Sequence, residues 1–197
     1  REKIIVDWIN NYCDKTSFEP KSLVVGISGG IDSSVVSTLC ALTNRKTLAR
    51  TSQTPGRTRQ LIFFELKQHL TKLRLVDLPG YGYAYAPLKK VEKWQKLLKA
   101  YLTGRVCLRR VFLLIDSRHG IKEVDESVML LLDKAAVTFQ IVMTKIDKPK
   151  KNELQQSIEK TQNALGKHPA AFPEILLTSS TKMTGIETLR TTIANIE

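Results

Sequence analysis

The stretch Phe139-Gln140-Ile141-Val142-Met143-Thr144-Lys145-Ile146-Asp147 is a mostly apolar run that ends in a tetrad with polar and charged residues at 144, 145 and 147. A short apolar run bounded by polar residues is typical of a buried strand that leads into a loop. Similar runs at 111–115 and 175–177 also end in polar residues, and helical patterns over 124–135 and 151–165 separate the three runs. Strands that alternate with helices predict a mostly parallel sheet with helices on both faces.

The same kinds of pattern continue toward both ends of the chain. Apolar residues recur at helical spacing over 2–13, 34–43, 88–103 and 184–195. Short apolar runs predict strands at 23–25, 61–64 and 73–76, with loops at 26–33 and 45–60. The short polar stretch between the second and third of these strands indicates an antiparallel hairpin. We therefore expect a single α/β domain over residues 1–197, with three layers and one antiparallel strand in a mostly parallel sheet.

The composition is that of an ordinary globular domain. Of the 197 residues, 42% are apolar and 25% are charged. No apolar run reaches the roughly 18 residues that a membrane-spanning helix needs.

The first residues include acidic side chains and no small-residue cleavage site, so no signal peptide is expected. Cys13, Cys40 and Cys107 lack metal-ligand spacing and are expected to be reduced. These features predict a cytoplasmic protein, and we expect a monomer.

The formal net charge is +12, and it is unevenly distributed. Residues 1–44 contain four Lys or Arg against five Asp or Glu, whereas residues 45–197 contain 27 against 14. A strongly basic surface favours a polyanionic partner, and RNA is the obvious one for a cytosolic protein. A solvated basic surface without such a partner is the alternative. The contrast also marks residues 1–44 as different in composition from the remainder.

Three short motifs follow predicted strands, where ligands bind in open α/β sheets. In Asp77-Leu78-Pro79-Gly80, the carboxylate can hold a Mg²⁺-bound water and the glycine N–H can approach a phosphate. In the tetrad 144–147, Asp147 can accept hydrogen bonds from N1–H and the 2-amino group of guanine, and the stem of Lys145 can lie on the base. The backbone of Thr178-Ser179-Ser180 can donate to the guanine O6.

Each motif alone has a simpler explanation, namely a turn, a helix-capping aspartate and a polar loop. Their order and spacing together indicate a GTPase domain. The guanine-binding residues predicted in this way are Thr144, Lys145, Asp147, Thr178, Ser179 and Ser180.

Longer strings then point to one family. The segments 51–58 (TSQTPGRT), 76–84 (VDLPGYGYA) and 114–120 (LIDSRHG) closely resemble the EngB (YihA) GTPases, and the resemblance runs from about residue 42 to the end. It implies a P-loop-NTPase-like fold and a ribosome-biogenesis GTPase that works with the large ribosomal subunit, with rRNA on the basic surface and a role in division septation. It also implies that Thr58 reaches Mg²⁺ and that Asp77 holds Mg²⁺ through a water. The phosphate-binding residues that follow from it are Gly56, Arg57, Thr58, Asp77 and Gly80.

The phosphate loop of such a domain is missing from its expected place. A GTPase needs GxxxxGK[ST], in which glycines let the backbone wrap the phosphates, the lysine neutralises them and the hydroxyl binds Mg²⁺. Residues 29–36 should form this loop and read GGIDSSVV. Ser34 replaces the second glycine, Val35 the lysine and Val36 the hydroxyl, so the sequence predicts impaired GTP hydrolysis.

A different phosphate loop stands there instead. The string 25–34 (VGISGGIDSS) resembles the SGGxDS PP-loop of N-type ATP pyrophosphatases, and the stretch 3–40 is most similar to ammonia-dependent NAD synthetase. Such a loop follows a strand, opens a helix and grips the pyrophosphate of ATP. The phosphate contacts that it implies are Ser28, Gly29, Gly30, Asp32 and Ser33. We therefore interpret the chain as a chimera of an NAD-synthetase-like segment, 1–44, and an EngB-like GTPase segment, 45–197.

Four functions stay open from the sequence. The first is GTP or GDP binding with weakened phosphate contacts. The second is a fold hybrid without nucleotide activity. The third is an ATP-binding remnant of the NAD synthetase type, and the fourth is an RNA-binding module that ignores nucleotide.

Overall fold

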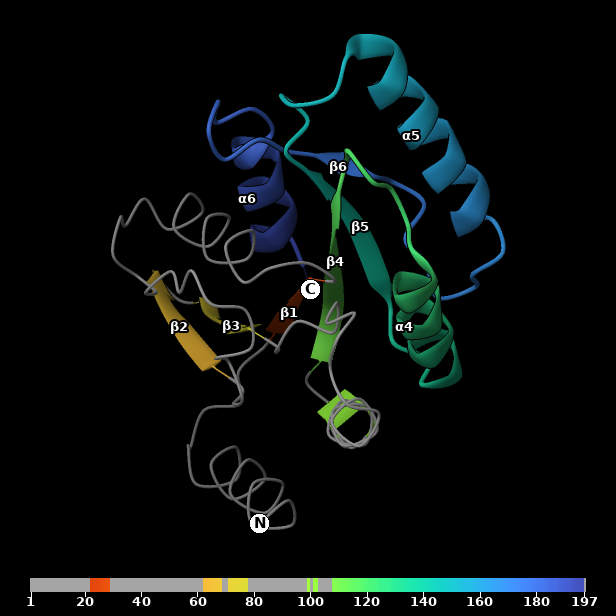
Figure 1. Cartoon of the computed structure of the whole chain (residues 1–197). Helices are drawn as coiled ribbons and strands as arrows, with labels where there is room; N and C mark the ends of the chain where they lie inside the picture. The colour runs from red at the N-terminus through yellow and green to blue at the C-terminus, as the bar shows by residue number, and fades with distance from the viewer. Residues whose placement is uncertain are drawn as a thin grey trace.

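The computed structural model of the chain describes residues 22–28, 62–68, 71–77, 99, 101–102 and 108–196 (Figure 1). Its centre is a six-stranded sheet with the order β2-β3-β1-β4-β5-β6. The strands are β1 (Ser22–Ser28), β2 (Ile62–Gln68), β3 (Thr71–Asp77), β4 (Leu108–Asp116), β5 (Phe139–Thr144) and β6 (Leu176–Leu177). Neighbouring strands are parallel except for the antiparallel pair β2 and β3, which confirms the predicted hairpin and the mostly parallel sheet.

Three helices are described in full, and they cover both faces of the sheet. They are α4 (Glu123–Lys134), α5 (Lys151–Leu165) and α6 (Ile186–Ala194). Figure 1 shows α4 and α5 on one side of the sheet and α6 on the other. This arrangement gives the three layers that the alternating pattern predicts.

The first turns of α4 and α5 are stabilised in the same way. The N–H of Lys122 donates to Asp125 Oδ2 at 2.8 Å, and the N–H of Lys150 donates to Glu153 Oε2 at 2.9 Å. Each carboxylate thereby satisfies a backbone donor that has no partner inside the helix, and its negative charge suits the positive end of the helix dipole. The helices therefore begin where the sequence places an acidic residue in the first turn.

Strand β1 lies at the centre of the sheet and is longer than the sequence predicts. The expected strand covered only 23–25, with a loop from Gly26, but β1 runs from Ser22 to Ser28. Gly26 pairs with Asp77 of β3 on one side and with Phe112 of β4 on the other. Parallel partners on both sides pair with β1 as far as Gly26, and β4 alone continues to pair with Ile27 and Ser28, so the strand continues past the first glycine.

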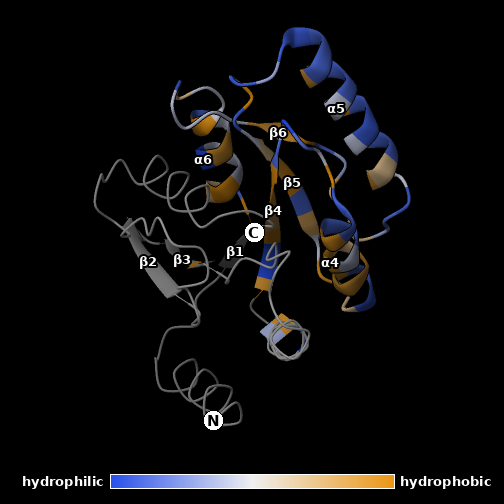
Figure 2. Cartoon of the chain, in the orientation of Figure 1, coloured by the Kyte–Doolittle hydropathy of each residue, from blue (hydrophilic) through white to orange (hydrophobic). Residues whose placement is uncertain are grey.

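The core is formed mainly by β4, β5 and α4. One cluster of buried side chains combines Val111, Leu113 and Ile115 of β4, Phe139, Ile141 and Met143 of β5, and Val128, Met129 and Leu132 of α4. The alternating residues Phe112, Leu114 and Val142 are buried too, and α6 contributes the buried Ile186, Leu189 and Ile193. Figure 2 shows hydrophobic residues concentrated on β4, β5 and parts of α4 and α6, whereas α5 is mostly hydrophilic. Strands β4 and β5 are therefore mostly apolar on both faces because helices cover both faces of the sheet.

Several expected elements lie partly or wholly outside the described residues. Lys99, Tyr101 and Leu102 are helical, and the last two are buried, but the remainder of the helix expected at 88–103 lies outside them. The helices expected at 2–13 and 34–43 also lie outside. Among the described segments, none of the helices has the length and apolar content needed to cross a bilayer.

The last helix starts at a glycine with a restricted backbone. Gly185 precedes α6 with φ of +68°, and Met183 also has a positive φ of 56°. A Cβ added to Gly185 would overlap the carbonyl oxygen of Leu177 in β6. The chain turns here in a left-handed conformation against β6, and for this reason α6 begins later than the position 184 expected from the apolar pattern.

Replacing this glycine should destabilise the whole domain. We expect Gly185→Ala to lower the free energy of unfolding by about 2 kcal/mol or more, since it adds left-handed strain and a steric overlap. The matched control is Gly166→Ala at the end of α5, where φ is −59° and an added Cβ would lie 3.6 Å from the Asn163 carbonyl oxygen. The control should be neutral or stabilising by up to about 1 kcal/mol. Urea unfolding followed by circular dichroism measures the stability of both variants. Equal effects would contradict the restricted backbone assigned to Gly185.

Candidate functional site

The ends of five strands meet at one edge of the sheet. Strands β3, β1, β4, β5 and β6 are mutually parallel, so their carboxyl ends point the same way. They end at Asp77, Ser28, Asp116, Thr144 and Leu177. Open α/β sheets bind ligands beyond this edge. The sequence-predicted site residues on β3, β1 and β5 and after β6 are therefore brought to a common edge.

The carboxylate of Asp147 is held by Ser179, a residue of the loop that follows β6. The hydroxyl of Ser179 donates to Asp147 Oδ1 at 2.6 Å, and the Lys148 ammonium lies 3.3 Å from Asp147 Oδ2. Ser179 is only 1% exposed, and its oxygen also accepts from the N–H of Lys182 at 3.1 Å. The serine is thus fixed on both sides, and it fixes the direction of the carboxylate.

These contacts also keep Asp147 ionised. The hydrogen bond from Ser179, with a smaller contribution from Lys148, lowers the pKa of the Asp147 carboxyl below its usual value. Ionised carboxylates only accept hydrogen bonds, with room for about two on each oxygen. Asp147 therefore stands at the sheet edge as an oriented acceptor that can pair with two neighbouring N–H donors.

Thr178 and Ser179 join their loop to the end of β5. The N–H and the hydroxyl of Thr178 both donate to the carbonyl oxygen of Met143, at 2.7 and 3.0 Å. The N–H of Ser179 donates to the carbonyl oxygen of Thr184 at 2.9 Å. The backbone donors that the sequence analysis assigned to guanine O6 are thus used within the protein at these two residues. Ser179 reaches the site through its hydroxyl instead.

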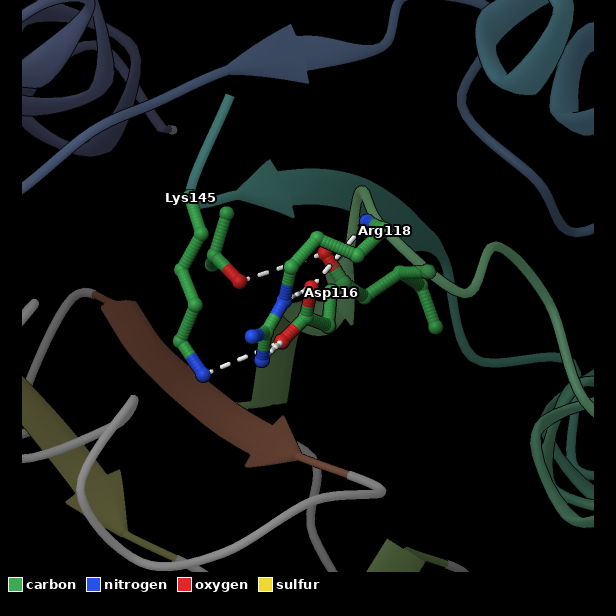
Figure 3. Close-up of polar contacts among 5 residues, drawn as sticks. Asp116, Arg118 and Lys145 are labelled. Carbon is green, nitrogen blue, oxygen red and sulfur yellow. Dashed lines mark hydrogen bonds and ion pairs between the residues drawn. The ribbon is translucent and has the colours of Figure 1, made fainter. Parts of the chain in front are cut away.

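Lys145 sits in a turn that directs its side chain across the edge. Its φ is 58°, an uncommon conformation for a residue with a side chain, and its carbonyl oxygen accepts from the N–H of Lys148 at 3.0 Å. Its ammonium donates to Asp116 Oδ2 at 3.0 Å, as Figure 3 shows. Lys145 therefore bridges the ends of β5 and β4, where Asp116 and Thr144 are paired neighbours.

The carboxylate of Asp116 accepts four hydrogen bonds, one from Lys145 and three from Arg118. Arg118 donates to Oδ1 from its backbone N at 3.1 Å and from Nε at 2.9 Å, and to Oδ2 from Nη2 at 2.7 Å (Figure 3). Partial burial acts to raise the pKa of Asp116, but the hydrogen bonds from Arg118 and Lys145 outweigh it and hold the pKa well below its usual value. Sequence reasoning did not select Asp116 or Arg118. The sequence feature that could have indicated Asp116 is its position at the end of an apolar strand, which is also the position of Thr144.

The phosphate side of the predicted site is only partly described. Asp77 ends β3 beside Gly26, and Ser28 ends β1 beside Leu114 of β4. The remaining predicted phosphate and metal residues lie outside the described residues, namely Gly29, Gly30, Asp32, Ser33, Gly56, Arg57, Thr58 and Gly80. Within the described ranges, no group of three or more His, Cys, Asp or Glu residues is arranged to hold a metal.

Strand order and edge motifs define a domain of the GTPase class, and family models agree. The model of the 50S ribosome-binding GTPases matches residues 33–145, and the model of the elongation factor Tu GTP binding domain matches residues 99–197. A third model, of NAD synthase, matches residues 2–59. The first model covers more than half of the chain.

Within that class, the chain belongs to the EngB family. It is 54% identical over 179 residues to the probable GTP-binding protein EngB of Roseobacter denitrificans, which covers 90% of this chain and 81% of that protein. It is 60% identical over 157 residues to the EngB protein of Ruegeria pomeroyi, covering 80% and 71%.

Solved structures share the fold. A crystal structure of a probable GTP-binding protein EngB superimposes with a TM-score of 0.67 at 18% identity, over 89% of this chain and 98% of that chain. Era in complex with MgGDPNP and part of 16S ribosomal RNA gives 0.68 at 21% identity, over 89% and 57%. The elongation factor SelB of Methanococcus maripaludis gives 0.64 at 22% identity over 90% of this chain, which spans 35% of that factor. At these identities the likeness concerns the fold alone.

Removing the Ser179 hydroxyl should raise the pKa of Asp147. The folded-state pKa is lowered, so ionised Asp147 stabilises the fold above the unfolded-state pKa, and this contribution is lost as the pH falls through the folded-state pKa. In Ser179→Ala the folded-state pKa should move up, and the stability lost on acidification should shrink. Titration of the Asp147 carboxyl carbon by NMR measures the first effect.

The matched control for this titration is Ser127→Ala. Ser127 is exposed on α4, and its hydroxyl donates to the carbonyl oxygen of Glu123 at 2.9 Å, away from Asp147. The Asp147 titration should be the same in this variant as in the unaltered protein. An Asp147 midpoint that does not move in Ser179→Ala would refute the role given to Ser179.

Proposed function

We propose that this chain binds guanine nucleotides with an intact base end and an altered phosphate end. The observation that carries the proposal is the Asp147 carboxylate, oriented by the buried Ser179 at 2.6 Å and kept ionised at the carboxyl edge of the sheet. Membership of the EngB family, whose relatives are named as GTP-binding proteins, supports the same assignment.

Base recognition would rest on complementary hydrogen bonds. Asp147 would accept from N1–H and the 2-amino group of guanine, which adenine does not present. Its oxygens have capacity for both, because Ser179 occupies one acceptor position on Oδ1 and Lys148 lies near Oδ2. The aliphatic stem of Lys145 would lie against the base, with Thr144 and the 178–180 loop framing the pocket. This arrangement selects guanine over adenine by leaving polar groups unpaired with the wrong base.

The altered phosphate end follows from residues 1–44. The NAD synthase match at 2–59 and the GTPase match at 33–145 support a chimera in which an NAD-synthetase-like strand, loop and helix replace the corresponding GTPase unit. The central position of β1, paired on both sides, is where the first strand of such a unit would have to lie. Ser28, Gly29, Gly30, Asp32 and Ser33 would then face the phosphates together with Gly56, Arg57, Thr58 and Gly80.

Mg²⁺ would be held by Thr58 and, through a water, by Asp77. The position of Asp77 fits this role, because it ends β3 beside Gly26 of the strand that leads into the phosphate segment. When bound, the ion would neutralise negative charge on the phosphate oxygens. Val36 offers no hydroxyl to the ion, and Val35 offers no ammonium to the phosphates.

Impaired hydrolysis is the consequence of these two valines. A charge-assisted hydrogen bond contributes about 1.5–3 kcal/mol. Without the lysine and the hydroxyl, nucleotide affinity should be lower by about two to four orders of magnitude. Transition-state charge on the phosphoryl group would lack the same contacts, so turnover should be close to absent.

A polyanionic partner is the second part of the proposal. The net charge of +12 favours RNA, and Era, a structural neighbour, has been solved with ribosomal RNA. Exposed lysines cluster beside the base end at Lys148, Lys150, Lys151 and Lys182. Binding to rRNA or the large ribosomal subunit should weaken steeply with salt, and binding that is insensitive to salt would contradict this part.

Base selectivity provides the direct test. The unaltered protein should bind GDP and GTP more tightly than ATP or xanthosine diphosphate. Asp147→Asn replaces one acceptor by an N–H donor, so it should lower GDP affinity by at least about tenfold and improve the affinity for xanthosine diphosphate, whose 2-oxo group accepts. Competition against a fluorescent nucleotide measures all four affinities.

A change on α5, away from the base end, is the control for these affinities. Glu159→Gln removes an exposed carboxylate on α5 that accepts from Gln155, and it should leave every affinity unchanged. Tighter binding of ATP than of GDP would favour the NAD-synthetase-like alternative. No binding of any nucleotide by the folded protein would favour a hybrid without nucleotide activity.

Rebuilding the phosphate loop tests the altered end separately. The triple change Ser34→Gly, Val35→Lys and Val36→Thr restores GxxxxGK[ST] at 29–36. We expect GDP affinity to rise by about two to four orders of magnitude, because two charge-assisted contacts return. A variant with Ser34→Gly alone is the control and should gain little. If the triple change leaves affinity unaltered, residues 29–36 do not face the phosphates.

A further inference from the structure

The polar cluster of Asp116, Arg118 and Lys145 is not explained by base recognition alone. It joins the end of β4 to the turn after β5, one strand away from the chain that leaves β1 (Figure 3). Lys145 is the residue whose stem would support the base, yet its ammonium is directed to a carboxylate of another strand at 3.0 Å.

We infer that Asp116 is a positioning residue that holds the Lys145 stem in place for the guanine base, with Arg118 holding Asp116. This inference rests on the proposed guanine site. The ligand is the guanine nucleotide of that site. Asp116 and Arg118 belong to the string 114–120 that carries the family resemblance, but the sequence analysis gave neither residue a role at the site.

Contacts other than that with Lys145 already fix the orientation of the Asp116 carboxylate. Arg118 grips both of its oxygens through Nε at 2.9 Å and Nη2 at 2.7 Å, a two-point geometry that sets the plane of the carboxylate. The backbone is fixed too, since the Asp116 carbonyl oxygen accepts from the N–H groups of His119 and Gly120, each at 3.0 Å. Ser117 N–H ties the same turn to the carbonyl oxygen of Thr144 at 3.0 Å. Lys145 thus meets a rigid acceptor.

Lys145 itself is a flexible side chain on a constrained backbone. A lysine that must be ordered by its ligand lowers the affinity, whereas one already ordered does not. The positive φ of 58° is an uncommon conformation that persists only where surrounding contacts enforce it, and such residues concentrate at binding sites. The hydrogen bond to Asp116 fixes the far end of the same side chain, so both ends of the stem are restrained.

A purely stabilising ion pair would be a weaker explanation. The side chains of Lys145 and Asp116 are 33% and 20% exposed, so solvent partly screens the pair and reduces what it adds to the stability of the fold. Arg118 alone already donates three of the four hydrogen bonds to the Asp116 carboxylate, so its ionised form has partners without Lys145. Preorganisation of Lys145 explains why Lys145 adds a fourth hydrogen bond to the Asp116 carboxylate at the sheet edge.

A double-mutant cycle on GDP binding tests the inference. Asp116→Ala should lower GDP affinity by about three- to tenfold, as expected for the loss of one positioning hydrogen bond. Lys145→Ala should lower it by at least as much. Adding Asp116→Ala to Lys145→Ala should then have almost no further effect, because Asp116 acts through Lys145. Asp116→Asn keeps an oxygen acceptor for Lys145 and should fall between Asp116→Ala and the unaltered protein.

A matched control and a nucleotide-free measurement complete the experiment. Glu187→Gln removes the charge from the exposed pair between Glu187 and Arg190, at 2.9 Å on α6, and should leave GDP affinity unchanged. NMR relaxation of the Lys145 ε-methylene without nucleotide should show greater motion in Asp116→Asn and Asp116→Ala than in the unaltered protein.

The outcomes separate this inference from the proposed function. If the unaltered protein binds GDP but Asp116→Ala lowers affinity equally with and without Lys145, the positioning role is overturned and the guanine site stands. Unchanged motion of Lys145 in both Asp116 variants would overturn it as well. If the folded, unaltered protein binds no guanine nucleotide, the proposed function is overturned and the positioning role falls with it.

Discussion

The parallel direction of the strands is the constraint on which the rest of this structure depends. Because β3, β1, β4, β5 and β6 all run the same way, every loop that carries a polar motif leaves the sheet at one edge. The apolar strands need helices on both faces, and these helices return the chain to the opposite edge each time. A site built from distant residues follows directly from this arrangement.

The site is held together by pairs of residues from neighbouring strand ends. Ser179, after β6, orients Asp147, after β5, and Asp116, at the end of β4, meets Lys145, also after β5. In each pair a residue with fixed surroundings restrains a residue that would contact the base. Such support is what a binding site needs if its ligand is not to bear the cost of ordering the side chains.

Much of the fold was predictable, because its elements are long and strongly patterned. The helix expected at 151–165 matches α5, and the apolar strands β4 and β5 lie where their runs place them. Errors occurred where tertiary contacts decide the ends. Strand β1 continues through Gly26 because partners on both sides satisfy its backbone, and α6 starts after Gly185 because the chain is pressed against β6. The local sequence does not show which strands will lie beside β1 or beside Gly185.

The sequence by itself determined the fold class, the family and the residues expected at the base, since the hydrophobic periodicity and the motif residues are written along the chain. It also shows valines at 35 and 36, the positions where the proposed phosphate loop would need a lysine and a hydroxyl. Only the tertiary structure decided that the N–H groups of Thr178 and Ser179 are used internally, and that Asp116 and Arg118 belong beside Lys145. The physical reason is that hydrogen bonds between strand ends depend on which strands are adjacent, and adjacency in the sheet is not adjacency in sequence.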